Sequence, residues 1–329
     1  MNNLKPVGII GTGKYVPEKI LTNSDLEKMV ETSDEWIVSR TGIRERHIAA
    51  PEQATSDLAY EAAVRALESA GMTAEELDLI IIATITPDMA FPSTACILQD
   101  KLGAKGAAAF DLSAACSGFV YGLATATSFI QAGMYRNALV IGADCLSRIT
   151  DYTDRNTCVL FGDGAGAVVL GEVPEGRGFK SFDLGAEGAG GPLLRLEAGG
   201  SRLPASAQTI ENKLHYIYMN GREVFKFAVR VMGTATDVVL GKAGLDKSDI
   251  DVFIPHQANI RIIQSAMQRL DLPEDKVMIN VDKYANTSAA SIPLALVEAA
   301  EEGRMKAGDR VLMVGFGGGL TWGASVLVW

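Results

Sequence analysis

Short apolar runs alternate along the chain with longer segments in which apolar residues recur every three or four positions. The first pattern predicts buried β-strands, and the second predicts helices with one face toward a core. Strands are predicted over residues 7–10, 79–83, 107–110, 138–141, 167–170, 252–254, 277–281, 311–314 and 324–328. Helices are predicted over residues 57–70, 116–132, 221–240, 259–270 and 288–302. Strands and helices that alternate in this way are typical of an α/β fold.

Two segments of the chain match each other in sequence. Residues 70–82 and 243–254 each read as the end of a helix, a turn, a short capped element and a buried strand, when one gap is allowed. An internal match of this kind indicates a repeated structural unit. It predicts two pseudo-symmetric halves, an N-terminal half over residues 1–176 and a C-terminal half over residues 177–329.

The match extends to Cys116 and Asn286. A helix of small residues starts at Cys116 and ends near Gly133, and another follows Asn286 and ends near Gly303, so that each spans seventeen positions. The two residues therefore occupy equivalent places, one in each half. If the halves pack about a pseudo-twofold axis, both helix N-termini converge on one cavity. His256 closes another strand of the C-terminal half.

Residues 185–204 interrupt this regular pattern. The segment is rich in glycine and shows little hydrophobic periodicity, so it predicts a long irregular excursion near the start of the C-terminal half. Loops of this length inside compact domains are usually functional or mobile.

Composition limits the classes of protein that fit the chain. It has 329 residues, of which 48% are hydrophobic and 21% charged, enough for a large core and more chain than one core usually holds. The net charge of −10 argues against a general nucleic-acid surface. The four cysteines show no C-x-x-C spacing and only three histidines are present, so neither a disulfide framework nor a metal cluster is predicted.

Neither a membrane segment nor a leader is predicted. The stretch from residue 112 to residue 135 has no charged residue, but its many Ser, Thr and Gly residues favour a buried helix over a transmembrane one. Residues 1–5 precede Pro6 and a strand, and they lack the pattern of a signal peptide. The sequence therefore predicts a soluble, cytoplasmic protein.

Cys116 is the first candidate for chemistry. A thiol at the point where a strand turns into a helix faces the positive end of the helix dipole, which favours the nucleophilic thiolate. The alternative is that Cys116 is a small buried hydrophobe, as buried cysteines often are. His256 in residues 255–259 and Asn286 in residues 284–288 add the residue types of nucleophilic catalysis. A papain-like hydrolase would use the same types, but its local signature is absent.

With these clusters in this order, the chain resembles the thiolase superfamily and, more closely, the β-ketoacyl-acyl-carrier-protein synthase III family. The resemblance covers essentially the whole chain and rests on several long motifs. They are residues 32–46, Cys116 in its setting, residues 161–167, residues 255–259, Asn286 and residues 316–323. The resemblance implies a five-layered αβαβα fold built from two similar halves, usually in a homodimer.

The resemblance also implies a reaction. Cys116 would take an acyl group from a short acyl-coenzyme A, malonyl-acyl-carrier protein (malonyl-ACP) would lose CO2, and the resulting carbanion would attack the acyl-enzyme. His256 and Asn286 would stabilise the enolate as neutral hydrogen-bond donors. The backbone N–H groups of Cys116 and Gly318 would hold the tetrahedral intermediate of acyl transfer. Acyl-coenzyme A is a substrate, so no cofactor is implied.

Further residues match the binding positions of the family. The implied coenzyme A contacts are Trp36, Arg40, Arg155 and Asn259, and the implied acyl-pocket residues are Phe91 and Phe161. The charges of Lys226 and Arg261 predict a basic patch at the mouth of the site, which would steer docking of an acidic acyl carrier protein. Phe91 would reach across the dimer to close the acyl pocket of the partner. The glycine-rich segment 315–319, which follows a buried strand, would bring backbone N–H groups close to a ligand.

Each of these positions also has a structural interpretation. Trp36 covered by Arg40 is a common half-buried pair, and Phe91 before a proline can belong to a core. Lys226 belongs to a stripe with Arg222 and Arg230, and a stripe of this kind is usually a solvated helix face. Arg222 is also a departure, because many relatives have Asn there in contact with pantetheine.

Other functions fit the sequence less well. Neither glycine segment, 11–13 or 162–166, has the strand–turn–helix context of a dinucleotide site. A degradative thiolase would need a second cysteine near the C-terminus, and residues 315–323 have none. A non-catalytic acyl-binding protein would not need all three catalytic residue types. The nearest alternative is a related synthase with an unusual starter for a polyketide or quinolone-type secondary metabolite.

Overall fold

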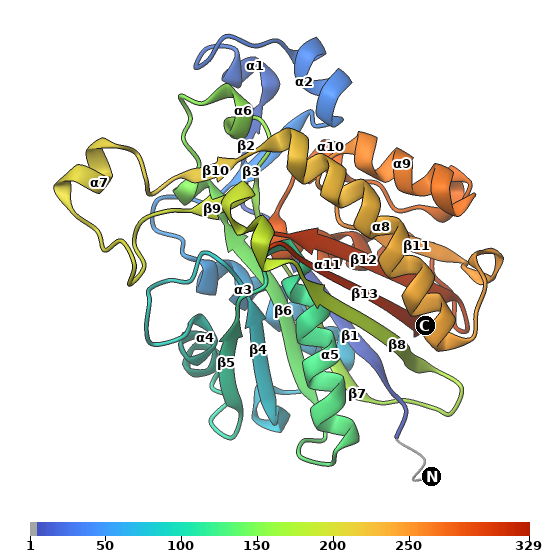
Figure 1. The fold of residues 1–329 in the computed structure, drawn as a ribbon. Coiled ribbons are helices and arrows are strands. Elements are labelled where there is room, and N and C mark those ends of the chain that lie inside the picture. The colour runs from blue at the N-terminus through green and yellow to red at the C-terminus, as the bar shows by residue number, and fades with distance from the viewer. Residues whose placement is uncertain (1–4) are drawn as a thin grey trace.

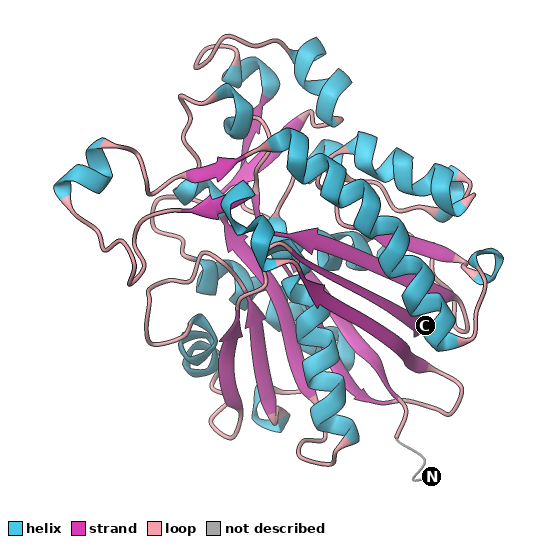
Figure 2. Ribbon diagram, viewed as in Figure 1, coloured by secondary structure: helices cyan, strands magenta, loops and turns pink. Residues whose placement is uncertain are grey.

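The structure is a computed structural model that describes residues 5–329 as two β-sheets with helices between them and on both outer faces (Figures 1 and 2). Residues 1–4 lie outside the described part. They include the start of the predicted N-terminal half and most of residues 1–5, whose sequence lacks a signal-peptide pattern. Within residues 5–329, none of the helices combines the length and apolar character that a membrane span requires.

The first sheet is five-stranded. Its order is β1 (Val7–Tyr15), β7 (Asp163–Glu172), β6 (Ala138–Cys145), β4 (Leu79–Ala83) and β5 (Ala108–Leu112). β7 pairs antiparallel with β1 and β6, whereas β4 pairs parallel with β6 and β5. Each predicted strand of the first half is therefore present, and several run further than the apolar runs indicate.

The second sheet repeats this arrangement. Its order is β8 (Gly178–Ala186), β13 (Thr321–Val328), β12 (Arg310–Gly317) and β11 (Val252–Pro255). The pairs β8–β13 and β13–β12 are antiparallel and β12–β11 is parallel, in the same sequence as in the first sheet. All strands of one sheet precede residue 173 and all strands of the other follow residue 177. The division of the chain into halves at residues 176 and 177 stays a prediction.

The strand predicted over residues 277–281 is wrong. Only Val277 makes a β-bridge, a parallel one to Phe253, at the edge where a fifth strand would lie. Gln257 Oε1 then accepts a hydrogen bond from the backbone N–H of Asn280 at 3.0 Å, and the chain turns into helix α10 (Val281–Tyr284). Val277 and Val281 are buried in this irregular segment although it is not a strand. An apolar run in the sequence therefore does not distinguish such a segment from a strand.

Six helices complete five layers. α3 (Thr55–Ala70) and α4 (Thr94–Leu102) cover the outer face of the first sheet, α5 (Gly118–Gln131) and α11 (Ser291–Glu301) lie between the sheets, and α8 (Gly221–Ala243) and α9 (Ile260–Leu270) cover the second sheet. The predicted helices are thus confirmed, although those at residues 116–132 and 288–302 each begin with a 3-10 turn.

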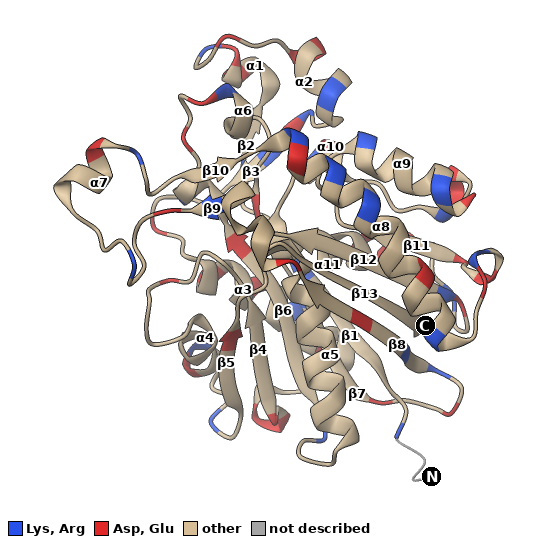
Figure 3. Ribbon diagram, viewed as in Figure 1, with Lys and Arg blue, Asp and Glu red and all other residues tan. Residues whose placement is uncertain are grey.

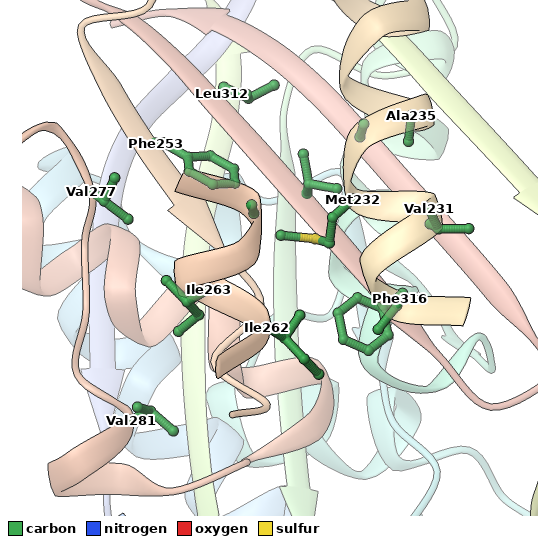
Figure 4. Close-up of a cluster of buried hydrophobic side chains, with 14 of the residues drawn as sticks. Val231, Met232, Ala235, Phe253, Ile262, Ile263, Val277, Val281, Leu312 and Phe316 are labelled. Atoms are coloured by element: carbon green, nitrogen blue, oxygen red, sulfur yellow. The ribbon is translucent and has the colours of Figure 1, made fainter. Parts of the chain in front are cut away.

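Buried side chains form three clusters, one between each sheet and its outer helices and one between the two sheets, around α5 and α11. Figure 4 shows the cluster under α8 and α9, where Val231 and Met232 of α8 and Ile262 of α9 lie near Phe316 of β12. The apolar residues of α8 recur every three or four positions, so one face of the helix is buried. Burying one such side chain stabilises the fold by about 1.5–3 kcal/mol.

Smaller elements surround this body. They are helices α1 (Asn23–Leu26), α2 (Asp34–Thr41), α6 (Arg155–Cys158) and α7 (Ala207–Glu211), and strand pairs β2 (Lys19–Thr22) with β3 (Glu45–Ile48) and β9 (Leu194–Leu196) with β10 (Ile217–Met219). The predicted irregular excursion over residues 185–204 is partly corrected, because it contains the end of β8, a 3-10 segment at Gly188–Leu193 and β9.

The two halves interlock through a glycine in each central strand. A Cβ atom added at Gly142 of β6 would lie 2.0 Å from the carbonyl oxygen of Ala289. One added at Gly315 of β12 would lie 3.1 Å from the carbonyl oxygen of Cys116. Each central strand therefore supports the turn that begins the central helix of the other half, which brings both turns to one place.

Candidate active site

Cys116, His256 and Asn286 line one cavity of about 160 Å3, under α8 and α9. Cys116 also lines a second, more apolar cavity of about 360 Å3, together with Ile85, Leu146 and other side chains. Phe161 lies in the walls of both cavities. The thiol is thus at the junction of two spaces, one of which contains the predicted His and Asn.

The residues before Cys116 and Asn286 both have a positive φ. Ala115 has φ of 47° and Ala285 has φ of 57°, in the left-handed region that non-glycine residues rarely adopt. Strained backbone of this kind persists only where the surrounding structure enforces it, and it is common at functional sites. The predicted equivalence of Cys116 and Asn286 is nevertheless wrong. Cys116 is the second residue of the 3-10 turn before α5, and Ala289 is the second residue of the matching turn before α11. Asn286 lies three residues before that position, so the two side chains reach one cavity from unequal places in the two halves.

The burial of Cys116 corrects the prediction that its side chain is a thiolate. The sequence favours a thiolate because of the helix dipole, but Cys116 lies in a 3-10 turn before α5 and is 9% exposed. Desolvation raises the pKa of this thiol to about 12, although a hydrogen bond with Ser288 acts in the opposite direction. The resting group is therefore a thiol, and its proton must leave when an acyl donor reacts.

His256 follows β11 and is held by a hydrogen bond from its backbone N–H to the carbonyl oxygen of Val314 at 2.8 Å. The residue is 1% exposed, and burial lowers the pKa of its imidazole to about 3. Its ring packs edge-on against Phe316 with 5.2 Å between centroids, and within residues 5–329 Nδ1 has no hydrogen-bond partner. At neutral pH the imidazole is therefore uncharged, as the sequence analysis expects of a neutral donor.

Hydrogen bonds hold both the backbone and the side chain of Asn286. Its backbone N–H donates to the carbonyl oxygen of Leu160 at 2.9 Å, and its side-chain Oδ1 accepts a hydrogen bond from the N–H of Ser288 at 2.9 Å. Because the amide oxygen is occupied, the NH2 group is the part of the side chain left to donate to a ligand.

The glycine-rich segment lies directly against Cys116. A Cβ atom at Gly317 would be 2.6 Å from the backbone nitrogen of Cys116, so only glycine permits this approach. Gly318 lines the 360 Å3 cavity with Cys116. The Thr321 hydroxyl lies 3.1 Å from the carbonyl oxygen of Ala114 and 3.0 Å from that of Gly318, and so joins the two segments. Thr321 was not predicted from the sequence to belong to the site.

The predicted coenzyme A residues form one group at the surface. The guanidinium carbons of Arg40 and Arg155 each lie 4.9 Å from the ring centroid of Trp36 on α2. Asn259 caps α9 and donates from Nδ2 to the carbonyl oxygen of Arg40 at 3.0 Å. Asn259 also lines the cavity with His256, so this group borders the proposed catalytic residues.

The remaining predicted residues divide into two places. Phe91 lies between β4 and α4, is 84% exposed and lines neither of the two cavities around Cys116. Lys226 and Arg261 are exposed on α8 and α9, and Lys226 forms an ion pair with Glu223 at 2.8 Å. Figure 3 shows Lys and Arg on α8, α9 and α2 at the same side of the molecule.

Comparison with protein families gives two matches. The family described as "3-Oxoacyl-[acyl-carrier-protein (ACP)] synthase III" matches residues 110–188, and "3-Oxoacyl-[acyl-carrier-protein (ACP)] synthase III C terminal" matches residues 240–329. The first match contains Cys116, and the second contains His256, Asn286 and Gly318.

Curated relatives and solved structures agree with these matches. The beta-ketoacyl-[acyl-carrier-protein] synthase III of Desulfitobacterium hafniense (strain Y51) is 62% identical over 323 residues, which cover 98% of each chain. The 3-oxoacyl-[acyl-carrier-protein] synthase III structure from Aquifex aeolicus is 51% identical, with a TM-score of 0.91 and coverage of 98% of this chain and 100% of that one. The priming β-ketosynthase of the R1128 polyketide pathway is 34% identical, with a TM-score of 0.92 and coverage of 100% and 97%.

Proposed function

The chain belongs to the 3-oxoacyl-acyl-carrier-protein synthase III family, and on this premise we propose that Cys116, His256 and Asn286 carry out its reaction in the cavity they share. The chain is a condensing acyltransferase that initiates fatty-acid synthesis. It joins an acyl primer from coenzyme A to malonyl-ACP and gives a β-ketoacyl-ACP, coenzyme A and CO2. The convergence of the three side chains on one cavity is the observation that carries the assignment of their roles.

In the proposed first step, Cys116 Sγ attacks the thioester carbonyl of the acyl-coenzyme A. The bond from the carbonyl carbon to the coenzyme A sulfur breaks, and the proton that leaves Cys116 ends on that sulfur, so no net charge is produced. The backbone N–H groups of Cys116 and Gly318 stabilise the oxyanion of the tetrahedral intermediate. The apolar 360 Å3 cavity beside Cys116 is the space we assign to the acyl chain.

In the proposed second step, malonyl-ACP enters beside His256 and Asn286. Loss of CO2 places negative charge on the malonyl thioester oxygen, and the imidazole and the Asn286 amide donate hydrogen bonds to it. The neutral state of His256 suits this donor role. The carbanion then attacks the acyl carbonyl, the bond from that carbon to Cys116 Sγ breaks, and the released thiolate takes up a proton from solvent to restore the thiol. Decarboxylation drives the formation of the carbon–carbon bond, so we infer that the reaction needs no bound cofactor.

We assign the binding of coenzyme A to Trp36, Arg40, Arg155 and Asn259. A guanidinium plane can stack on an adenine ring or pair with a phosphate, and the two arginines already lie beside the Trp36 indole. We also infer a cytoplasmic location, because acyl-coenzyme A and acyl carrier protein are substrates of cytoplasmic synthesis.

We propose that the active unit is a homodimer in which Phe91 reaches the acyl pocket of the partner subunit. An apolar ring that is 84% exposed in the single chain is costly to leave in water. A partner pocket would remove this ring from solvent and would close the cavity beside Cys116.

Docking of the acidic acyl carrier protein is assigned to the exposed face with Lys226 and Arg261. Arg261→Glu and Lys226→Glu are expected to raise the apparent KM for malonyl-ACP by about three- to tenfold, with kcat little changed, because charges at an interface rim mainly affect encounter. Arg261→Glu should have the larger effect, because Glu223 already partly neutralises Lys226. Steady-state kinetics at low and high salt would measure this.

Lys105→Glu is the matched control for docking, since Lys105 is exposed in the turn between α4 and β5, away from α8 and α9. It should leave the KM unchanged. A KM for malonyl-ACP that responds neither to salt nor to the two variants on α8 and α9 would exclude docking at this face.

Turnover tests the function as a whole. Purified protein should condense malonyl-ACP with acetyl-coenzyme A or a similar short primer, and β-ketoacyl-ACP should appear in mass spectra. A panel of straight, branched and aromatic acyl-coenzyme A primers separates this activity from its alternative. The 34% identity to a priming β-ketosynthase of a polyketide pathway supports that alternative, which predicts a strong preference for an unusual starter.

A further inference from the structure

Ser288 contacts two of the three residues assigned to catalysis. Its Oγ lies 3.6 Å from Cys116 Sγ, and its backbone N–H donates to Asn286 Oδ1 at 2.9 Å. Ser288 is 1% exposed, and within residues 5–329 its hydroxyl is the only side chain that forms a hydrogen bond with the thiol. The two contacts use different parts of the residue, since the side chain faces Cys116 and the main chain faces Asn286.

The turn that carries this hydroxyl is held from behind by the buried side chain of Asp144. Asp144 Oδ2 accepts a hydrogen bond from the N–H of Ala289 at 3.1 Å. Burial raises the pKa of the Asp144 carboxyl, and the nearby Ser288 hydroxyl acts in the opposite direction. Asp144 Oδ1 is held in turn by Thr84 Oγ1 at 2.9 Å and by the N–H of Ile85 at 2.8 Å. Ser288 itself has φ of 51°, so the surrounding structure enforces its conformation.

The geometry allows the Ser288 hydroxyl to form a hydrogen bond with Cys116 Sγ both when the sulfur is a thiol and when it is a thiolate. In the resting site the S–H of Cys116 donates to Ser288 Oγ, and the hydroxyl proton can point to Asp144. When the thiol proton departs, the same hydroxyl can rotate and donate to the sulfur. A thiolate in this buried place has few other donors, and a hydrogen bond to a charged group is worth more than one between neutral groups.

We infer that Ser288 is a positioning residue that orients the Cys116 thiol and stabilises its anion during acyl transfer, an inference that rests on the proposed role of Cys116 as the nucleophile. In that step the sulfur–carbon bond to Cys116 forms, the bond to the coenzyme A sulfur breaks and the proton passes to coenzyme A, so Ser288 is not consumed. The hydroxyl has no part in the loss of CO2 from malonyl-ACP, where His256 and Asn286 act.

Two substitutions separate the hydroxyl from the backbone conformation. Ser288→Ala and Ser288→Gly both remove the hydroxyl and keep the N–H that holds Asn286, but only glycine accepts the left-handed conformation without strain. Both variants are expected to lower the rate of Cys116 alkylation by iodoacetamide, and of its acetylation by acetyl-coenzyme A, by about tenfold or more. Decarboxylation of malonyl-ACP without primer should fall far less, by about twofold at most.

The chain supplies its own reference in Cys96, which is exposed on α4. Peptide mass spectrometry after brief alkylation gives both rates in one sample, and an unchanged Cys96 rate shows that the reagent and the fold are intact. Equal Cys116 rates in wild type and both variants would overturn the inference, as would a loss in Ser288→Ala that Ser288→Gly restores. If wild-type Cys116 is alkylated but never acetylated, the proposed function fails while the contact between Ser288 and the thiol is still tested.

Discussion

Replacement of Cys116 by serine is expected to abolish formation of the acyl-enzyme. A hydroxyl is a much weaker nucleophile than a thiol, and the buried turn offers no group that would activate it as strongly. Condensation should fall by at least about a thousandfold, as is usual when a covalent nucleophile is removed. Incubation with acetyl-coenzyme A followed by mass spectrometry of the intact protein would show the missing acetyl group.

The same variant should continue to decarboxylate malonyl-ACP, since His256 and Asn286 are unchanged and that step forms no bond to Cys116. Cys158→Ala is a suitable control. It also removes a buried thiol, whose pKa burial raises to about 11, but Cys158 lines neither of the two cavities around Cys116. Full acetylation of the Cys116→Ser protein at another residue would refute the assignment of the nucleophile.

Loss of either donor to the enolate is expected to slow decarboxylation more than acyl transfer, which is the reverse of the effect of Cys116→Ser. His256→Ala and Asn286→Ala should each slow decarboxylation of malonyl-ACP by about 10²–10³-fold, the usual effect of removing one preorganised donor. Acetylation of Cys116 should fall by less than about tenfold, because its oxyanion is assigned to backbone N–H groups. Asn286→Asp keeps the shape of the side chain but removes the donor, so it should resemble Asn286→Ala.

The pH dependence of decarboxylation gives an independent check on His256. Its neutral form is the active one, and burial holds its pKa at about 3, well below the ordinary value. The rate should therefore stay level as pH falls from 8 to 5, and the contribution of His256 should be lost only as pH approaches 3. An acidic limb centred near the ordinary pKa of histidine, which disappears in His256→Ala, would show that the imidazole is not desolvated during catalysis.

The sequence predicts the α/β class, most of the strands and the three residues that meet at the cavity. The strands succeed because hydrophobic periodicity is a local property that survives tertiary packing. The three residues succeed because each stands in a short motif that its own neighbours in sequence identify. The strand expected at residues 277–281 fails because buried valines fit an irregular segment as well as a strand. β8 was not predicted, since glycine and charged residues interrupt its apolar pattern.

Properties that depend on packing between the two halves could not be predicted from the sequence. The helix dipole suggests a thiolate at Cys116, but burial by the other half raises the thiol pKa instead. Ser288 stands only two positions after Asn286, yet its hydroxyl meets the Cys116 thiol only through folding that joins residues 172 positions apart. The repeat offered one signal, because it pairs the turns that begin the two central helices.

The interlocked glycines Gly142 and Gly315 have an evolutionary consequence. If the two halves arose by duplication of an ancestral gene, they have not been free to diverge independently, because the turn of each copy rests on the central strand of the other. Residues 142 and 315 should therefore stay glycine across homologues, because a side chain at either place would meet backbone atoms that no compensating substitution can remove. The same dependence means that neither copy can be inherited, exchanged or engineered as a self-sufficient module.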